Sequence, residues 1–434
     1  MRKGVLIFLS LAVVASFACS KKKNPAPVTG LDIAETQPDI PPVDTGAPFD
    51  PIKAAELEDQ FIGLLTNNPD EARIGDLKDA IWQLGKLRSQ KALPAVLRAL
   101  FIDNNAGETT ADTARVALGR IQNGVLESIE TIFAGKDDEF LAWTSTNKTP
   151  EWEWRFGPSL IVTLHDIRQP GAAKVILNNL IAEFPNIREI DESSRRTFAR
   201  LIKRRWQRGA IALADYRDDS ILPKLIKSAS DRSADTLLRK RLIWSLAMMG
   251  TPAARKGMFT IYAKEPHDQV RTHFMESIVL GLHPDDMATF EEKIRKPGSE
   301  EKQVGSQLTD NRRIKAQLEL IGECQKDISC YIRVLQSEGQ MSLNDMFRKE
   351  KAALFLAQQT PAQDQHFQIA LEALKKTPSR AANLRIYLFL AIANHANSQH
   401  LDALKEYYGE LARDETRASM GPELRMLAIH LEPR

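Results

Sequence analysis

The chain has 434 residues, of which 43% are hydrophobic, so it can bury a large core. Its 59 basic and 57 acidic residues nearly balance, and two of the basic ones, Arg2 and Lys3, lie in a segment that we expect to be removed. The mature chain is therefore close to neutral, which excludes a general electrostatic attraction to nucleic acid.

The first 18 residues have the pattern of a secretory signal peptide. Arg2 and Lys3 precede an apolar run of 14 residues, Gly4 to Phe17, and small residues stand at Ser16 and Ala18. Because the run is too short to span a bilayer comfortably, a signal peptide is favoured over an anchor helix. Residues 1–18 are therefore predicted to be cleaved; a buried helix at the start of a cytosolic fold is the alternative.

The next residue, Cys19, resembles the acylated cysteine of bacterial lipoproteins, where signal peptidase cuts before a Cys that carries the acyl chains. This chain departs from that pattern at Ser16, where Leu is usual, and at the bulky Phe17. The resemblance implies a lipid anchor at Cys19, and Ser20 favours sorting to the outer membrane, facing the periplasm, whereas Lys21 to Lys23 leave the inner membrane open as an alternative. Simple secretion is the alternative, because Ser16 and Ala18 also suit ordinary signal cleavage.

Residues 19–51 are predicted to form an extended tether. Seven prolines fall within residues 20–51, with few bulky apolar residues among them. Such a segment cannot offset its ordering entropy by burial. At about 3 Å per residue when extended, it can hold a folded body tens of ångströms from a membrane. Lys21 to Lys23 are interpreted either as a contact with anionic lipid or as a solvated charge run.

The body of the chain, residues 52–434, repeats a short pattern of a basic residue, four mostly apolar residues, a Leu and usually a small residue. RLIWSLA at residues 241–247 and KAALFLA at residues 351–357 are clear copies. The marker leucines are Leu84, Leu118, Leu164, Leu213, Leu246, Leu280, Leu320, Leu356 and Leu390. Their spacing of 33 to 49 residues indicates helical repeats, and the scarcity of alternating β-branched residues argues against strands. We therefore predict an all-α fold.

This pattern resembles the HEAT-repeat family, specifically its bacterial envelope members. The resemblance is carried by Asp268 to Arg271, which match the Asp-x-Val-Arg pattern before an apolar helix, and by LGKLRSQKALPAVLRAL from Leu84 to Leu100. It covers Ile52 to Pro433 and implies an α-solenoid of helix pairs, with an irregular junction near residues 140–158. Such an open stack contacts only its neighbours and leaves a concave surface for binding.

Two details of the repeated pattern have structural meaning. The small residue after each marker Leu is expected to let the neighbouring helix approach closely, because a bulky residue there would hold the two helices apart. The Arg or Lys that begins the pattern is expected to be a boundary charge in most repeats. None of the marker leucines is assigned a functional role, because burying such a side chain stabilises the fold by about 1.5–3 kcal/mol.

Cys324 and Cys330 stand where one predicted helix ends and the next begins. In an oxidising envelope compartment, a C-x5-C pair across such a turn is placed to form a disulfide. The bacterial HEAT-repeat resemblance points the same way, since Cys, a short acidic turn and Cys-Tyr often occur together there. A pair of reduced core thiols and a redox-active pair are the alternatives.

Two segments are candidates for contact with a partner protein. In the first, residues 142–158, Trp152 and Trp154 alternate with charged residues and suit an interface anchor. The alternative is that the rings of this segment, which also include Trp143 and Phe156, pack over the irregular junction between repeats.

The second segment is a predicted helix at Ser193 to Gly209, the most cation-rich in the chain. An apolar stripe that includes Ile202 and Trp206 is surrounded by basic residues. With Arg239, Lys240 and Arg241, these form either a basic patch for an acidic protein, a lipid phosphate or an anionic glycan, or a solvated face with internal ion pairs. The candidate partner-binding residues here are Arg200, Arg204, Arg205 and Arg208.

No motif predicts catalytic residues, a metal site or a cofactor. None of the eight histidines is adjacent to a Glu, and neither H-E-x-x-H nor G-x-S-x-G occurs. His395 and His400 are five residues apart, a spacing that does not place both on one helical face. His165 and His267 lie near expected helix ends, where a cap or surface position is favoured over a ligand or base.

These features predict a lipid-anchored bacterial envelope protein whose solenoid binds other envelope proteins as a scaffold or assembly factor. Nucleic acid is not expected as a partner, because that compartment does not normally contain it. One alternative is a HEAT-type enzyme or cofactor-handling lyase, in which catalysis depends on residues brought together only in three dimensions. The other is a binder of anionic glycan or lipid phosphate through the basic helix.

Overall fold

The computed structural model describes residues 49–67, 72–103, 109–147, 152–182, 192–295, 310–338, 342–378, 380–413 and 421–432. These residues belong to one compact unit that covers Ile40–Arg434. Within these ranges the regular secondary structure is helical, apart from an isolated bridge between Asp103 and Thr109. The predicted all-α class is confirmed, whereas the predicted signal peptide, Cys19 and all but the end of the predicted tether lie outside the described residues.

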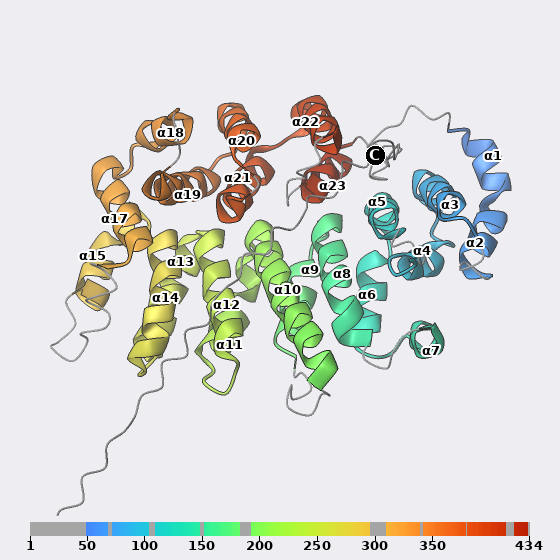
Figure 1. Cartoon of the computed structure of the whole chain (residues 1–434), viewed down its shortest axis with the longest axis horizontal. Helices are drawn as coiled ribbons and strands as arrows, with labels where there is room; N and C mark the ends of the chain where they lie inside the picture. The colour runs from blue at the N-terminus through green and yellow to red at the C-terminus, as the bar shows by residue number, and fades with distance from the viewer. Residues whose placement is uncertain are drawn as a thin grey trace, which may run out of the picture. The chain divides into compact units, whose positions relative to one another are not determined.

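The helices form an N-terminal set and a C-terminal set (Figure 1). The N-terminal set is α1 (Pro51–Glu56), α2 (Glu58–Thr66), α3 (Ile74–Leu87), α4 (Leu93–Ala99), α5 (Ala111–Ile121), α6 (Val125–Phe133), α7 (Asp138–Asn147), α8 (Trp152–Ile167), α9 (Ala172–Leu180), α10 (Glu192–Tyr216), α11 (Leu222–Ser230), α12 (Thr236–Met249), α13 (Pro252–Lys264), α14 (Asp268–Gly281) and α15 (Met287–Phe290). The C-terminal set is α17 (Arg312–Cys324), α18 (Ile328–Gln336), α19 (Leu343–Ala357), α20 (Asp364–Lys376), α21 (Ala382–His395), α22 (Leu401–Arg413) and α23 (Gly421–Leu431). Short 3₁₀ helices at Asp219–Ile221, Pro284–Asp286 and Ser398–His400 and a π-helix at Glu291–Arg295 lie between them.

Every marker leucine is buried inside a helix. Their side chains are at most 5% exposed, and they lie in α3, α5, α8, α10, α12, α14, α17, α19 and α21. These helices contact one another in succession, each with the next. The other helices pack against this line, as α4 does on α5, α11 on α12 and α20 on α21. The marker pattern therefore identifies the helices that form the continuous line of packing.

At Gly85 and Gly281, the small residue after a marker Leu allows close helix contact, as predicted for these positions. A Cβ atom on Gly85 would lie 2.7 Å from the Cα of Ala117, and one on Gly281 would lie 2.7 Å from the Cα of Ala247. These are backbone atoms, which cannot move aside as the end of a side chain can. Glycine at these two positions lets α3 approach α5 and α14 approach α12.

The C-terminal set packs against the N-terminal set, with α19 beside α14, α21 beside α10, and α23 beside α5 and α8 (Figure 1). The Trp244 Nε1 donates to the Tyr387 hydroxyl at 3.0 Å, and the Gln358 Nε2 donates to the Ala247 carbonyl at 2.8 Å. The expectation that helices contact only their neighbours is therefore wrong. The C-terminal helices cover faces that an open stack would leave exposed.

A buried lysine, Lys351, also joins the two sets. Its side chain is 1% exposed, and its Nζ donates to the carbonyls of Leu280 at 2.7 Å and Leu282 at 2.5 Å. The Leu280 carbonyl has no helical donor, because Pro284, four residues later, lacks an N–H. Burial lowers the pKa of Lys351 to about 7. Lys351 begins one copy of the repeated pattern, so the expected boundary charge is an interior contact here.

Candidate functional site

The aromatic residues near the junction of α7 and α8 form a packed cluster. The rings of Phe101 and Phe156 have centroids 4.2 Å apart, and those of Phe140 and Trp143 are 5.6 Å apart. Phe140 and Phe156 are buried, and Trp143 is half-buried against the core. For Trp143 and Phe156, the interpretation that the rings pack over the junction is confirmed.

Trp152 and Trp154 lie in the first turn of α8. The structure does not describe the side chains of these two residues. Their role as anchors for a partner therefore stays a prediction.

Helix α10 carries the predicted cation-rich surface. Arg200, Lys203 and Arg204 are exposed, and their spacing of three and four residues places them on one side of the helix. Ile202 and Trp206 are buried, with exposures of 4% and 7%, so the predicted apolar stripe faces the core. We call Arg200, Lys203 and Arg204 the α10 basic face.

Arg205 does not belong to this surface, and its prediction as a partner-binding residue is wrong. Its side chain is 3% exposed, and its guanidinium donates to the Asn179 carbonyl at the end of α9, at 2.6 Å. It also packs beside Gly157 of α8, where an added Cβ would lie 3.1 Å from a guanidinium nitrogen. Arg205 therefore links α10 to α8 and α9, while Arg208 is half-buried at the edge of the basic face.

The three cations of α12 do not act as one surface. Arg239 is 4% exposed, donates from Nε to the Ala229 carbonyl at 2.9 Å and pairs with Glu265. Although burial raises the pKa of Glu265, the hydrogen bond from Arg239 holds it below its usual range. Lys240 and Arg241 are half-buried instead, and the Arg241 guanidinium lies 5.3 Å from the Trp244 ring centroid. Only these two remain available to a ligand.

The histidines considered as ligands or bases are mostly structural. His165 is 6% exposed, and its Nε2 lies 2.7 Å from the Asp215 Oδ2, which also bonds to Arg168. Although burial raises the pKa of Asp215, Arg168 and His165 hold it below its usual value. The expectation of a cap or surface position is therefore wrong for His165. It is confirmed for His267, which is exposed and precedes the first residue of α14.

His395 is buried and fully bonded. Its Nε2 is 2.9 Å from the Leu356 carbonyl, and its Nδ1 accepts from the Gln363 N–H at 3.2 Å. These partners require a neutral ring with the proton on Nε2, and burial lowers the pKa of His395 in the same direction. His395 therefore stabilises the contact between α21 and α19 and offers no open nitrogen for chemistry.

Cys324 and Cys330 form the predicted disulfide, with their Cα atoms 5.4 Å apart. Cys324 is the last residue of α17, and Cys330 lies in the first turn of α18. The turn between them is closed further by the Tyr331 hydroxyl, which donates to the Gln325 carbonyl at 3.0 Å. The bond fixes the angle between these two helices.

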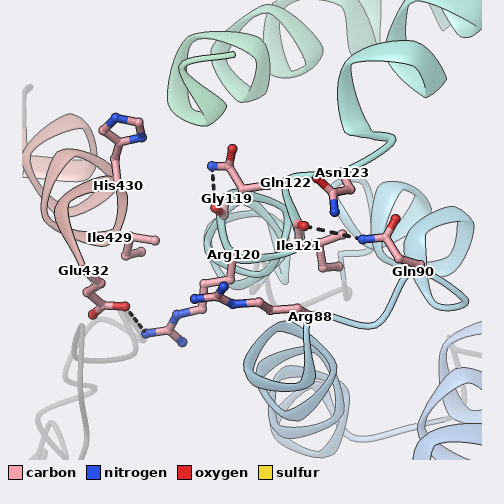
Figure 2. Close-up of a pocket in the computed structure, with 10 residues that line it drawn as sticks. All are labelled: Arg88, Gln90, Gly119, Arg120, Ile121, Gln122, Asn123, Ile429, His430 and Glu432. Atoms are coloured by element: carbon pink, nitrogen blue, oxygen red, sulfur yellow. Dashed lines mark hydrogen bonds and ion pairs between the residues drawn. The ribbon is translucent and has the colours of Figure 1, made fainter. Parts of the chain in front are cut away.

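A cavity of about 250 Å³ lies where the ends of α3 and α5 meet α23 (Figure 2). Arg88 and Arg120 reach toward Glu432, and an Arg120 nitrogen lies 3.6 Å from a Glu432 oxygen. The Arg120 guanidinium also stacks over the Trp82 ring, 4.3 Å from its centroid. Since Arg120 is held by both contacts, this arrangement is best described as a link between the N-terminal and C-terminal sets.

Comparisons with known proteins assign no family: neither a protein-family model nor a curated protein matches this chain. Within the described ranges, no group of three or more His, Cys, Asp or Glu side chains is placed to hold a metal ion. In the same ranges, no helix has the length and apolar character needed to cross a membrane. The resemblance to HEAT repeats therefore stays a prediction from motifs.

Proposed function

We propose that the protein is a lipid-anchored scaffold of the bacterial envelope that binds an acidic partner protein through the α10 basic face. The observation that carries this proposal is the alignment of three exposed cations, Arg200, Lys203 and Arg204, on one side of a helix. A surface of one charge attracts and orients a partner of the opposite charge and speeds their association.

The packing around α10 supports this function. Arg205, Ile202 and Trp206 hold the helix against the core from the side opposite the exposed cations. The basic face is therefore presented by a fixed helix, and little conformational entropy is lost from its backbone when a partner binds. Long side chains on a rigid helix suit recognition of a complementary acidic surface.

The proposed cellular location depends on the N-terminal sequence together with the disulfide. Residues 1–18 resemble a lipoprotein signal peptide, Cys19 is the expected acylation site, and residues 19–51 form the expected tether. The bond between Cys324 and Cys330 suits an oxidising compartment such as the periplasm. We place the protein on the outer membrane, facing the periplasm.

Crosslinking in the native envelope tests the proposal. The tagged wild-type chain is compared with Arg200→Glu/Arg204→Glu and with Lys256→Glu/Lys315→Glu, a control that makes the same charge change at two exposed lysines outside α10. We expect the α10 variant to lose a stoichiometric protein partner that the control retains. Equal capture by both variants would contradict a role for the α10 basic face.

The same preparation distinguishes the alternatives. Mass spectrometry of the N-terminal peptide should find an acylated Cys19, and an unmodified cysteine would exclude the lipid anchor. Salt-sensitive binding to anionic vesicles without a protein partner would instead support recognition of lipid phosphate. A metal or cofactor that copurifies with the chain would favour an enzyme.

A further inference from the structure

A second cleft, of about 210 Å³, opens where α12 and α14 face α17, α19 and α21. Residues three or four apart on each of α12, α14, α17 and α21 line it, so one stripe of each of these helices faces the cleft. We call it the Gln317 cleft and define it by Lys240, Arg241, Trp244, Arg313, Gln317 and Glu350. It lies between the two sets of helices and is separate from the α10 basic face.

Gln317 is the feature of this cleft that calls for a ligand. Its side chain is completely buried, with 0% exposure. Neither its amide oxygen nor its amide nitrogen has a hydrogen-bond partner among the described residues. A buried amide without partners destabilises a fold, because the polar atoms lose water and gain nothing in return. A ligand with one donor and one acceptor would satisfy both atoms once neighbouring side chains of the cleft move aside, because 0% exposure leaves no space against the amide as it stands.

The charges of the cleft favour an anionic ligand. Arg313 is matched within the protein, since it lies 3.4 Å from a Glu350 oxygen and 3.8 Å from a Glu276 oxygen. Lys240 and Arg241, in contrast, form no ion pair within 4 Å among the described residues, although the Glu276 carboxylate of the same cleft raises the pKa of Lys240 against the lowering effect of burial. These two half-buried cations are therefore the groups available to an anion.

The remaining walls limit the ligand's size and shape. Trp244 is 8% exposed, and its indole is fixed by the hydrogen bond to the Tyr387 hydroxyl and by Arg241 above its ring. It therefore offers a rigid apolar surface. The cleft is smaller than sites for drug-sized ligands, which occupy about 300–1,000 Å³. A molecule of one or two amino-acid units suits this space.

We infer that the Gln317 cleft binds a small ligand that carries a carboxylate and an amide, such as an N-acyl amino acid or a dipeptide. The carboxylate lies against Lys240 and Arg241, and the amide pairs with Gln317 through one donated and one accepted hydrogen bond. The Trp244 ring packs against the aliphatic part. This inference is independent of the proposed scaffold function and of the α10 basic face.

Calorimetric titration of the purified mature chain tests the inference with N-acetylalanine and alanylalanine. N-Acetylalanine methyl ester serves as the probe without a carboxylate, and acetate serves as the probe without an amide. We expect both acids to bind and both control probes to bind at least tenfold more weakly. Absence of measurable binding by both acids at millimolar concentration would overturn the inference.

Variants separate ligand recognition from folding. Gln317→Leu should lose at least tenfold in affinity, as should Lys240→Met/Arg241→Met. The control Gln359→Leu, whose Nε2 bonds to the Phe355 carbonyl of α19 just after that helix ends, should bind like the wild type. Without ligand, Gln317→Leu should also melt at a higher temperature than the wild type, because it removes unpaired polar atoms. A lower melting temperature, or unchanged affinity, would show that Gln317 has a structural role and would overturn the inference.

Discussion

Replacing Lys351 by Met should destabilise the protein substantially, because the side-chain amine joins α19 to the end of α14. The Nζ of Lys351 donates to the carbonyls of Leu280 at 2.7 Å, Leu282 at 2.5 Å and Val279 at 3.3 Å. The Val279 carbonyl keeps a second bond from the Leu282 N–H at 3.2 Å. Pro284 supplies no N–H to Leu280, so the substitution leaves the Leu280 and Leu282 carbonyls without this donor.

The magnitude follows from those two carbonyls. A buried acceptor left unsatisfied costs about 1–3 kcal/mol, so two cost roughly 2–6 kcal/mol. The substitution also removes the cost of burying the amine, which offsets part of this loss. That cost is reflected in the pKa of Lys351, which burial lowers from 10.5 to about 7. Met keeps the apolar stem, so no large cavity forms. We expect the free energy of unfolding to fall by about 2–4 kcal/mol.

Urea unfolding at pH 8, followed by far-ultraviolet circular dichroism, measures this change. Lys315→Met is the matched control, because Lys315 begins the same repeated pattern in α17 but its side chain is 62% exposed, 3.9 Å from Glu319. Loss of such a surface pair should cost less than about 0.5 kcal/mol. If Lys351→Met costs no more than this control, the reasoning about the buried contact is refuted.

Two further predictions concern helix contact and pH. Gly281→Ala should cost about 1–3 kcal/mol, because its Cβ would lie 2.7 Å from the Cα of Ala247. Gly322→Ala in α17, with nothing within 4 Å, should stabilise by about 0.5–1 kcal/mol, and urea unfolding that gives both variants the same sign would contradict the close-contact argument. Burial raises the pKa of Glu350 from 4.5 to about 7, so the folded chain binds its proton more tightly than the unfolded chain. The free energy of unfolding should therefore fall as pH rises from 4.5 to 7, by up to about 3 kcal/mol from this group. The free energy of unfolding is measured against pH for the wild type and for Glu350→Gln, and the difference between the two isolates the contribution of Glu350. A difference that does not change with pH would exclude this contribution.

The local sequence pattern predicts the helices well, because the buried side of a helix requires apolar residues at regular spacing along the chain. The marker leucines are buried, the glycines after Leu84 and Leu280 lie against neighbouring backbone, and Cys324 and Cys330 are bonded across a turn. Each of these features depends on residues within one helix pair or the next. The spacing of residues along the chain is therefore sufficient to predict these features.

Contacts between the two sets could not be predicted in this way. Trp244 and Tyr387 are 143 residues apart, and no periodicity relates them. The same limit explains the different environments of equivalent residues: Lys315 is exposed, whereas Lys351 and Arg385 are 1% and 3% exposed. Whether a residue that begins the pattern is a boundary charge depends on which helix covers it, and this is a property of the tertiary fold.

The error at Arg205 has a more local cause. The basic surface of α10 was predicted from the number of cations, whereas exposure depends on their angle around the helix. Arg205 follows Ile202 by three residues and therefore lies on the buried stripe, while Arg200, Lys203 and Arg204 lie off it. A helical projection anchored on Ile202 and Trp206 would have separated Arg205 from the others.

Polar groups at the interface between the two sets of helices differ in whether they have a hydrogen-bond partner across it. Apolar stripes alone would allow the sets to slide, and the bonds of Trp244, Gln358 and Lys351 each fix one relative position. Gln317 lies at the same interface but has no partner among the described residues, so it fixes no position and lowers stability. A leucine of similar volume would serve packing better. The presence of an amide there is therefore better explained by a ligand than by the fold.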